Sequence, residues 1–190
     1  MQQQRLEFWQ LMQGVLASYL IFIDESGINL ARTRLFARSP KGQRARGVRQ
    51  KKRGKNVSLI GAIGLNGLVT QVSLLGSTDG LTFEAFIAQR LVPKLWPGAC
   101  VLMDNCSIHK GKKIEALITK AGAKLIYLPP YSPDFSPIEN CWSKIKSLLR
   151  SISARNYTDL AKAIEEAFNK VSLENIRGWF THCCYCTSTD

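Results

Sequence analysis

The 190-residue chain is poor in acidic residues and in histidine. It has 14 Asp and Glu against 26 Lys and Arg, only two His, and a formal net charge of +12 at pH 7. This excess of positive charge indicates a polyanionic partner, nucleic acid first, although a basic structural protein would have the same balance. The sequence also offers no convincing arrangement of Ser or Cys with His that would make a protein nucleophile.

Long hydrophobic runs and a secretion signal are also missing. No apolar run approaches the ~20 residues that a membrane helix needs. The first ten residues, MQQQRLEFWQ, do not place a basic stretch before an apolar one, as a signal peptide would. We therefore expect neither membrane insertion nor secretion, and predict a cytoplasmic protein. Since 45% of the residues are hydrophobic, the chain can form one domain with a real core.

The six cysteines indicate neither a disulfide framework nor a clear zinc site. Three lie in segments predicted to enter the core, and three lie in the tail HCCYC: Cys100, Cys106, Cys141, Cys183, Cys184 and Cys186. The tail holds one C-x-x-C pair beside His182, and one pair without a second is weak support for zinc. We expect reduced cysteines in a reducing cytosol.

Hydrophobic periodicity predicts alternating strands and helices. A hairpin is expected around Asn66-Gly67, which is a strong signal for a tight turn. The predicted strands are Leu20–Ile23, Val57–Gly64, Leu68–Leu75, Cys100–Met103 and Lys124–Leu128. The predicted helices cover about 4–17, 81–92, 111–121, a stretch from Pro137, a stretch capped by Thr158, and 172–180. This order is typical of an α/β fold with a mixed sheet flanked by helices.

Three acidic residues lie where predicted strands end or a predicted helix begins. Asp24 comes after the strand at Leu20–Ile23, and Asp104 directly follows Cys100–Met103. Ligand sites in such sheets lie beyond the carboxyl ends of strands, so these two side chains can be neighbours. Glu139, in the first turn of the helix from Pro137, can reach the same point. Converging carboxylates suit hard divalent cations such as Mg²⁺ or Mn²⁺.

Each acid also has a simpler interpretation. Asp24 could be a turn former before Gly27. Glu139 could be the acid of a capping box that starts at Ser136, whose hydroxyl would accept a backbone hydrogen bond at the helix start.

Positive charge is concentrated in residues 32–55, here called the basic insertion. Gly and Pro interrupt it, which favours a loop over a helix. We predict that its cations contact DNA phosphates, together with cations of the helix from Pro137; a solvated insertion without a ligand is the alternative. The predicted DNA-binding residues are Arg44, Arg46, Arg49, Lys51, Lys52, Arg53, Lys55, Lys144, Lys146 and Arg150.

Three motifs carry a resemblance to a known family. They are FIDESG around Asp24, MDNCSIHK around Asp104 and YSPDFSPIENCWSKIKSLLR around Glu139, with 34 residues between the last two acids. The chain resembles the mariner-like DDE transposases, most closely the bacterial insertion-sequence branch, from about residue 6 to the HCCYC tail. The resemblance implies a ribonuclease-H-like catalytic domain over residues 20–190, with residues 1–19 as a helix and linker.

The same resemblance implies a chemistry. Asp24, Asp104 and Glu139 would hold two Mg²⁺ or Mn²⁺ ions that promote DNA cleavage and strand transfer. His109 would contact DNA or a reacting phosphate, or else be a hydrogen-bonded structural histidine. Asn105 would orient Asp104, or else be a turn residue. Glu25 should point away from Asp24, because consecutive strand residues face opposite sides of the sheet.

The resemblance also concerns partners. Relatives carry helix-turn-helix modules before the catalytic domain, whereas about 20 residues precede the first predicted strand here, too few for such a module. We therefore expect end recognition by a separately encoded subunit or reading frame, and a homodimer acting on element ends and target DNA. The alternatives are a nuclease of the same fold, such as a resolvase or ribonuclease H, and an inactive DNA-binding transposase remnant.

Overall fold

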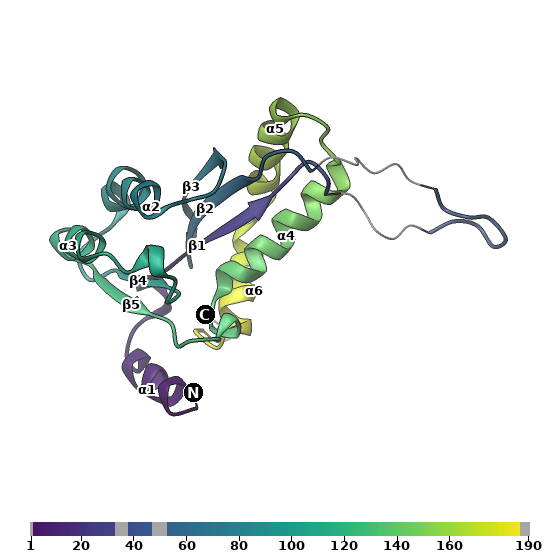
Figure 1. Ribbon diagram of the computed structural model, residues 1–190. Coiled ribbons are helices and arrows are strands. Elements are labelled where there is room, and N and C mark those ends of the chain that lie inside the picture. The colour runs from purple at the N-terminus through teal and green to yellow at the C-terminus, as the bar shows by residue number, and fades with distance from the viewer. Residues whose placement is uncertain (1, 33–37, 47–52, 187–190) are drawn as a thin grey trace.

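A five-stranded mixed sheet forms the centre of the molecule (Figure 1). The computed structural model describes residues 2–32, 38–46 and 53–186. The strands are β1 (Leu20–Ile28), β2 (Val57–Gly64), β3 (Gly67–Leu75), β4 (Cys100–Met103) and β5 (Lys124–Tyr127), in the spatial order β3-β2-β1-β4-β5. β1 pairs antiparallel with β2 and parallel with β4. The predicted mixed α/β sheet is confirmed.

Helices cover both faces of the sheet (Figure 1). They are α1 (Gln2–Met12), α2 (Gly80–Phe86), α3 (Lys112–Lys120), α4 (Pro137–Ile152), α5 (Tyr157–Asn169) and α6 (Leu173–His182). Side chains of β1 alternate between two cores: Phe22 packs with residues of α4, α5 and α6, whereas Ile21 and Ile23 pack with residues of α2 and α3. The unbroken apolar run of β1 is explained by this burial on both faces.

Helix α4 buries one apolar stripe, as the helical period predicts. Ile138, Trp142 and Ile145 are fully buried against the sheet. Pro137 occupies the start of the helix, where a missing N–H costs nothing. Ser136 is the N-cap residue, but its side chain makes no capping hydrogen bond. The capping-box interpretation of Glu139 is therefore wrong, and its carboxylate is not held by the cap.

Strand β1 is longer than predicted. It continues through Asp24 to Ile28 because β2 remains paired with it as far as the Ile28–Val57 pair. The interpretation of Asp24 as a turn former is therefore wrong.

Several helix boundaries also differ from the predictions. α1 ends at Met12, and a short 3-10 turn at Ala17–Tyr19 leads into β1. The segment predicted as one helix over 81–92 is α2 followed by a π turn at Ile87–Leu91 and a 3-10 turn at Val92–Lys94. Asn156, rather than Thr158, caps α5, since its side chain accepts a hydrogen bond from the Asp159 N–H.

The first helix packs onto the same body as the sheet. Phe8 and Met12 of α1 are buried in the core shared with α4. Arg5 forms an ion pair of 2.6 Å with Asp134 and stacks over the ring of Phe135. These contacts tie α1 to the loop that precedes α4. Among the described residues, no helix is long and apolar enough to span a membrane, and all six cysteines are free thiols.

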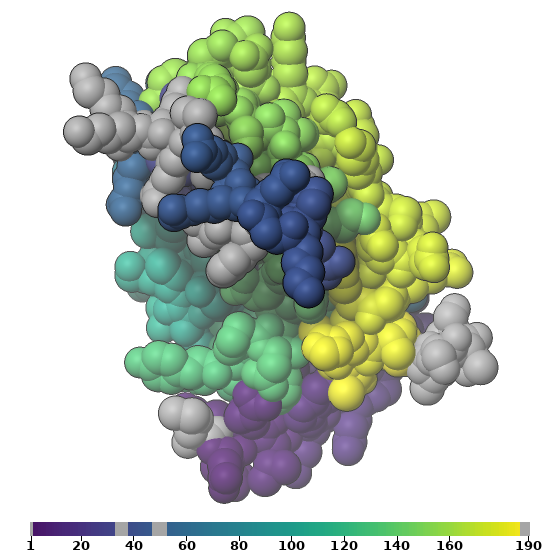
Figure 2. Space-filling model, turned by 90° about the vertical axis from the view of Figure 1, so that its right-hand side faces the viewer, coloured from purple at the N-terminus to yellow at the C-terminus, as the bar shows by residue number. Residues whose placement is uncertain are grey.

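The basic insertion leaves the body between β1 and β2. At its base, the Leu30 N–H donates to the Arg53 carbonyl oxygen at 3.2 Å, and the Lys55 N–H donates to the Tyr157 hydroxyl at 2.5 Å. Residues 38–46 are exposed and lie on the α4 side of the molecule in both views (Figures 1 and 2). Arg44 and Arg46 are among them, whereas Arg49, Lys51 and Lys52 lie outside the described residues.

Candidate active site

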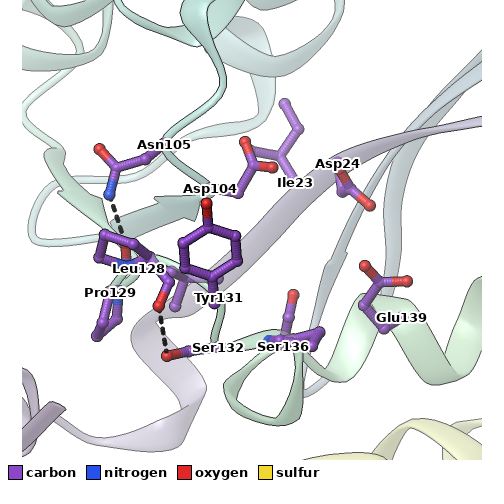
Figure 3. A pocket seen from close by; sticks show the side chains of 12 residues that line it. Ile23, Asp24, Asp104, Asn105, Leu128, Pro129, Tyr131, Ser132, Ser136 and Glu139 are labelled. Carbon is purple, nitrogen blue, oxygen red and sulfur yellow. Dashed lines mark hydrogen bonds between the residues drawn. The ribbon is translucent and has the colours of Figure 1, made fainter. Parts of the chain in front are cut away.

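Asp24, Asp104 and Glu139 line one cavity of about 430 Å³, here called the acidic cavity. Asp24 comes from β1, Asp104 from the segment after β4, and Glu139 from the first turn of α4. Figure 3 shows the carboxyl groups of Asp24 and Glu139 pointing toward each other, with Asp104 beside them. The fold thus brings together three acids that the sequence separates widely.

The sheet itself places the two aspartates side by side. The parallel ladder between β1 and β4 ends at the pair Phe22–Leu102. Asp24 and Asp104 each follow two residues after their member of that pair. Both therefore project from the same edge of the sheet, beyond the carboxyl end of the ladder, where α/β sheets place their ligands.

Trp142 of α4 contacts Asp24 directly. Its indole Nε1–H donates to Asp24 Oδ2 at 3.0 Å, and the rest of the ring is buried in the core. Gly61, which faces Asp24 across the β1–β2 ladder, leaves room for the ring. Sequence reasoning missed this contact. The available signal was the position of Trp142 three residues after Glu139, since a buried indole N–H needs an acceptor.

The acids lie close enough to influence one another. Burial and, after it, the negative charge of Glu139 together raise the pKa of Asp24 to about 7. A carboxyl group in this state is stabilised when a cation is added, so the donor set fits a divalent ion.

The acids do not yet form a closed metal site. Within the described ranges, no group of three or more His, Cys, Asp or Glu side chains is arranged to hold a metal as it stands. Glu139 is exposed, so its side chain has room to rotate toward an ion.

Asp104 Oδ1 accepts a backbone hydrogen bond and forms an ion pair with His109, whose Nδ1 also lies 3.3 Å from the Asp104 backbone oxygen. The Cys106 N–H donates to Oδ1 at 2.9 Å, and His109 Nδ1 lies 2.6 Å from Oδ1. The bond from His109 lowers the pKa of Asp104. His109 also contacts Glu25, with 2.6 Å between Nε2 and Oε2. Burial alone would lower the pKa of His109, but the two carboxylates raise it to about 10.

The observed partners of the Asp104 carboxylate thus differ in part from the predicted ones. His109 is buried and hydrogen-bonded, which fits the structural alternative, and it contacts Asp104 itself. Asn105 donates to the Leu128 carbonyl oxygen at 2.7 Å and so joins the ends of β4 and β5. Glu25 does point to the opposite face from Asp24, as predicted, yet it reaches Asp104 through His109. Sequence reasoning missed this contact.

The loop before α4 forms one wall of the acidic cavity. It runs from Pro129 to Ser136, and all but two of its residues line the cavity. Tyr131 has a backbone φ of 56° and is 85% exposed at the cavity edge. Such a conformation is uncommon for a residue with a side chain and marks a constrained turn. Asp134 is paired with Arg5 and is not part of the cavity lining.

Positively charged residues of α4 lie next to the acidic cavity. Lys146 and Arg150 follow Glu139 by two and three helical turns, on the same side of the helix. Burial and the nearby Arg32 lower the pKa of Lys146, while Glu139 and Asp24 act to raise it. Lys144 is on another side of α4, where its ammonium group donates to Asn175 of α6.

Comparison with known proteins identifies the family. A family model described as "DDE superfamily endonuclease" matches residues 19–161, a stretch that includes all three acids of the cavity and the basic insertion. The chain belongs to this family. Comparison with curated proteins gave no match.

Solved structures share the fold of this DDE endonuclease chain. The crystal structure of the catalytic domain of Mos1 mariner transposase aligns with a TM-score of 0.67 at 15% identity, over 96% of this chain and 85% of that one. The Mos1 paired-end complex with the left transposon end gives 0.75 at 16% identity, over 96% and 57%. The Mos1 paired-end complex with Mn gives 0.74 at 15%, over 96% and 57%. This chain therefore spans little more than half of the chains in the two paired-end complexes.

Proposed function

We propose that this chain is the catalytic domain of an insertion-sequence transposase, which cleaves DNA and joins a 3′-OH end to target DNA. The observation that carries the proposal is the acidic cavity, where Asp24, Asp104 and Glu139 meet from three separate segments. All three lie inside the region that matches the DDE endonuclease family. No protein nucleophile is needed, because water or a DNA 3′-OH attacks the phosphodiester in such reactions.

Asp24, Asp104 and Glu139 are the residues that would hold divalent metal ions, Mg²⁺ or Mn²⁺. When bound, two such ions would supply charge that activates the attacking oxygen and stabilises the leaving oxygen. The raised pKa of Asp24 supports this role, since its half-buried carboxylate and the neighbouring Glu139 repel each other without a cation. The Mos1 paired-end complex with Mn supports the same class of ion.

DNA would lie across the α4 side of the molecule. Lys146 and Arg150 would contact phosphates beside the cavity, with Arg32 close to Lys146. Arg44, Arg46, Arg53 and Lys55 would extend this surface, whereas Lys144 is turned toward Asn175 of α6. Arg49, Lys51 and Lys52 remain predicted contacts outside the described residues. We further propose a homodimer at paired element ends, end recognition by a separately encoded helix-turn-helix subunit or reading frame, and a cytoplasmic location.

Three isosteric substitutions test the proposed chemistry. Asp24→Asn, Asp104→Asn and Glu139→Gln should each abolish Mn²⁺-dependent nicking of a supercoiled plasmid, because an amide is a poor ligand for a hard cation. DNA binding, measured by fluorescence anisotropy, should change little. Glu165→Gln, an exposed residue of α5, is the matched control and should cleave like the wild type. Nicking that persists in any one of the three variants removes that residue from the site.

A second assay separates the proposal from its alternatives. An oligonucleotide with a free 3′-OH element end is incubated with plasmid and Mn²⁺, and covalent joining is measured. Joining supports a transposase, whereas hydrolysis without joining indicates a nuclease of the same fold. DNA binding without either reaction would indicate an inactive remnant.

A further inference from the structure

A chain of side chains links β1, at the residue after Asp24, to Asp104 across the end of the sheet. Glu25 follows Asp24 in β1 and faces the side covered by α2 and α3. His109 ends the short 3-10 turn at Ser107–His109, just after Asp104. Its imidazole lies 2.6 Å from Glu25 Oε2 through Nε2, and 2.6 Å from Asp104 Oδ1 through Nδ1. Both ring nitrogens are thus engaged with carboxylate oxygens.

The histidine ring is fixed in this position. It is 1% exposed, and its centroid lies 4.4 Å from that of Phe83. Its backbone is fixed too, because the Tyr127 hydroxyl donates to the His109 carbonyl oxygen at 3.0 Å. By contrast, the Asp104 side chain is 57% exposed and follows the last residue of β4. Without a partner, an exposed aspartate at such a point would populate several rotamers.

The contact occurs where the sheet no longer holds the two strands together. The β1–β4 ladder stops at Phe22–Leu102, before either aspartate. Beyond that pair, the link from Glu25 through His109 to Asp104 joins β1 to the segment after β4. The hydrogen bond from the Cys106 N–H and the ion pair with His109 both go to Asp104 Oδ1. The other oxygen, Oδ2, is left for a ligand.

Glu25 is a poor choice if stability alone is the reason for its presence. Its Oε1 atom is buried and, among the described residues, has no hydrogen-bond partner. A buried carboxylate oxygen without a partner costs free energy, so an unpaired atom of this kind calls for another explanation. Orientation of a metal ligand through a histidine and a carboxylate is one such role.

We propose that Glu25 is a positioning residue, which sets the orientation of Asp104 through His109 so that Asp104 Oδ2 is ready for a metal ion. The inference rests on the proposed function, since it concerns the same acidic cavity. It adds Glu25, on the opposite face of β1, to the residues on which metal binding depends.

Two substitutions of Glu25 test the proposal. Glu25→Ala removes the acceptor for His109 and should weaken Mn²⁺ binding, measured by electron paramagnetic resonance, by about 10- to 100-fold. Glu25→Gln keeps an oxygen that accepts from Nε2–H, so its Mn²⁺ affinity should stay within about threefold of the wild type. Glu84→Ala breaks the surface pair with Lys113 and is the matched control, with unchanged affinity. Circular dichroism confirms that each variant is folded.

Crystal structures of the metal-free wild type, Glu25→Ala and Glu25→Gln give the second readout. We expect one Asp104 rotamer on His109 in the wild type and in Glu25→Gln, and a different or divided one in Glu25→Ala. An unchanged rotamer, or unchanged Mn²⁺ affinity, in Glu25→Ala overturns the positioning role while leaving the proposed function intact. If the wild type binds no Mn²⁺, the proposed function fails instead, and the Asp104 rotamers alone decide whether Glu25 orients it.

Discussion

At the scale of single residues, the surroundings of Asp24 disfavour its ionised form. The side chain is half-buried beside Glu139, and its pKa is raised from 3.8 to about 7, by burial first and by neighbouring charge second. The folded protein therefore binds a proton at Asp24 more tightly than the unfolded chain does. Ionised Asp24 lowers stability above pH 7, and this cost disappears as the pH falls from about 7 toward 4.

We predict that Asp24→Asn stabilises the metal-free protein at high pH. A rise of the pKa from 3.8 to about 7 corresponds to about 4 kcal/mol at most. We expect a gain of about 1–3 kcal/mol at pH 8.5, because the amide oxygen can still accept from Trp142. At pH 4 the gain should nearly vanish, since near the unfolded pKa of 3.8 the unfolded chain also binds a proton at Asp24. Thermal unfolding at the two pH values measures both.

Metal should reverse the order of stability of the wild type and Asp24→Asn. Saturating Mn²⁺ should raise the melting temperature of the wild type, because a ligand that binds only the folded state stabilises it. It should leave that of Asp24→Asn almost unchanged. Equal metal-free stability of the two proteins at pH 8.5 would show that the buried carboxylate carries no such cost.

At the scale of elements, β2 and α4 meet behind Asp24, and the space between them is small. A Cβ atom on Gly61 would lie 2.8 Å from Cη2 of Trp142. The indole is rigid and fully buried, so it cannot yield as a flexible side-chain end would. Gly61 is needed for this close approach, and the approach sets where the indole N–H meets Asp24.

We predict that Gly61→Ala lowers the free energy of unfolding by about 1–3 kcal/mol through overpacking. It should also reduce Mn²⁺-dependent nicking, because a displaced indole no longer donates to Asp24 Oδ2. The matched control is Gly178→Ala in α6, where a Cβ meets nothing within 4 Å. There, alanine should stabilise the helix by about 0.5–1 kcal/mol. Urea unfolding and the nicking assay measure both changes, and wild-type stability in Gly61→Ala would contradict the packing argument.

The order of elements could be predicted because it depends on local patterns. The runs that form β2, β4 and β5 are apolar and bounded by turn signals, and the stripe of α4 repeats at the helical period. The end of β1 was missed because it is set by pairing with β2 through Ile28, which the polar residues around Asp24 do not reveal. Tertiary pairing overrode the local signal there.

The candidate site likewise contains residues that the sequence predicts and contacts that it does not. Asp24, Asp104 and Glu139 could be chosen as candidates because each follows a recognisable strand or helix start. Their partners could not. Glu25 and His109 are 84 residues apart, and Trp142 and Asp24 are 118 apart, so no local pattern connects them. Contacts of this kind depend on how the sheet and α4 pack, which periodicity does not specify.

At the scale of the whole molecule, the cations behind the net charge of +12 are unevenly distributed. The described part of the basic insertion lies on the α4 side (Figure 2). On α4 itself, Lys146 and Arg150 follow Glu139 along one face of the helix. Charge alone predicts binding to a polyanion, but its distribution predicts where the polyanion lies. A DNA strand gripped by these cations would pass directly beside the acidic cavity.

We therefore predict that removing cations weakens DNA binding only when the cations lie on the α4 side. The double variant Lys146→Ala/Arg150→Ala should weaken binding to a DNA duplex and reduce the slope of log affinity against log salt by about 0.9 for each lost contact. Lys120→Ala removes an exposed cation of α3, on the opposite face of the sheet, and should leave the slope unchanged. Fluorescence anisotropy over a series of salt concentrations gives both slopes. Equal loss in the two proteins would mean that DNA is held by total charge, with no preferred face. A loss confined to the double variant would place the bound strand along α4, within reach of Asp24 and Glu139.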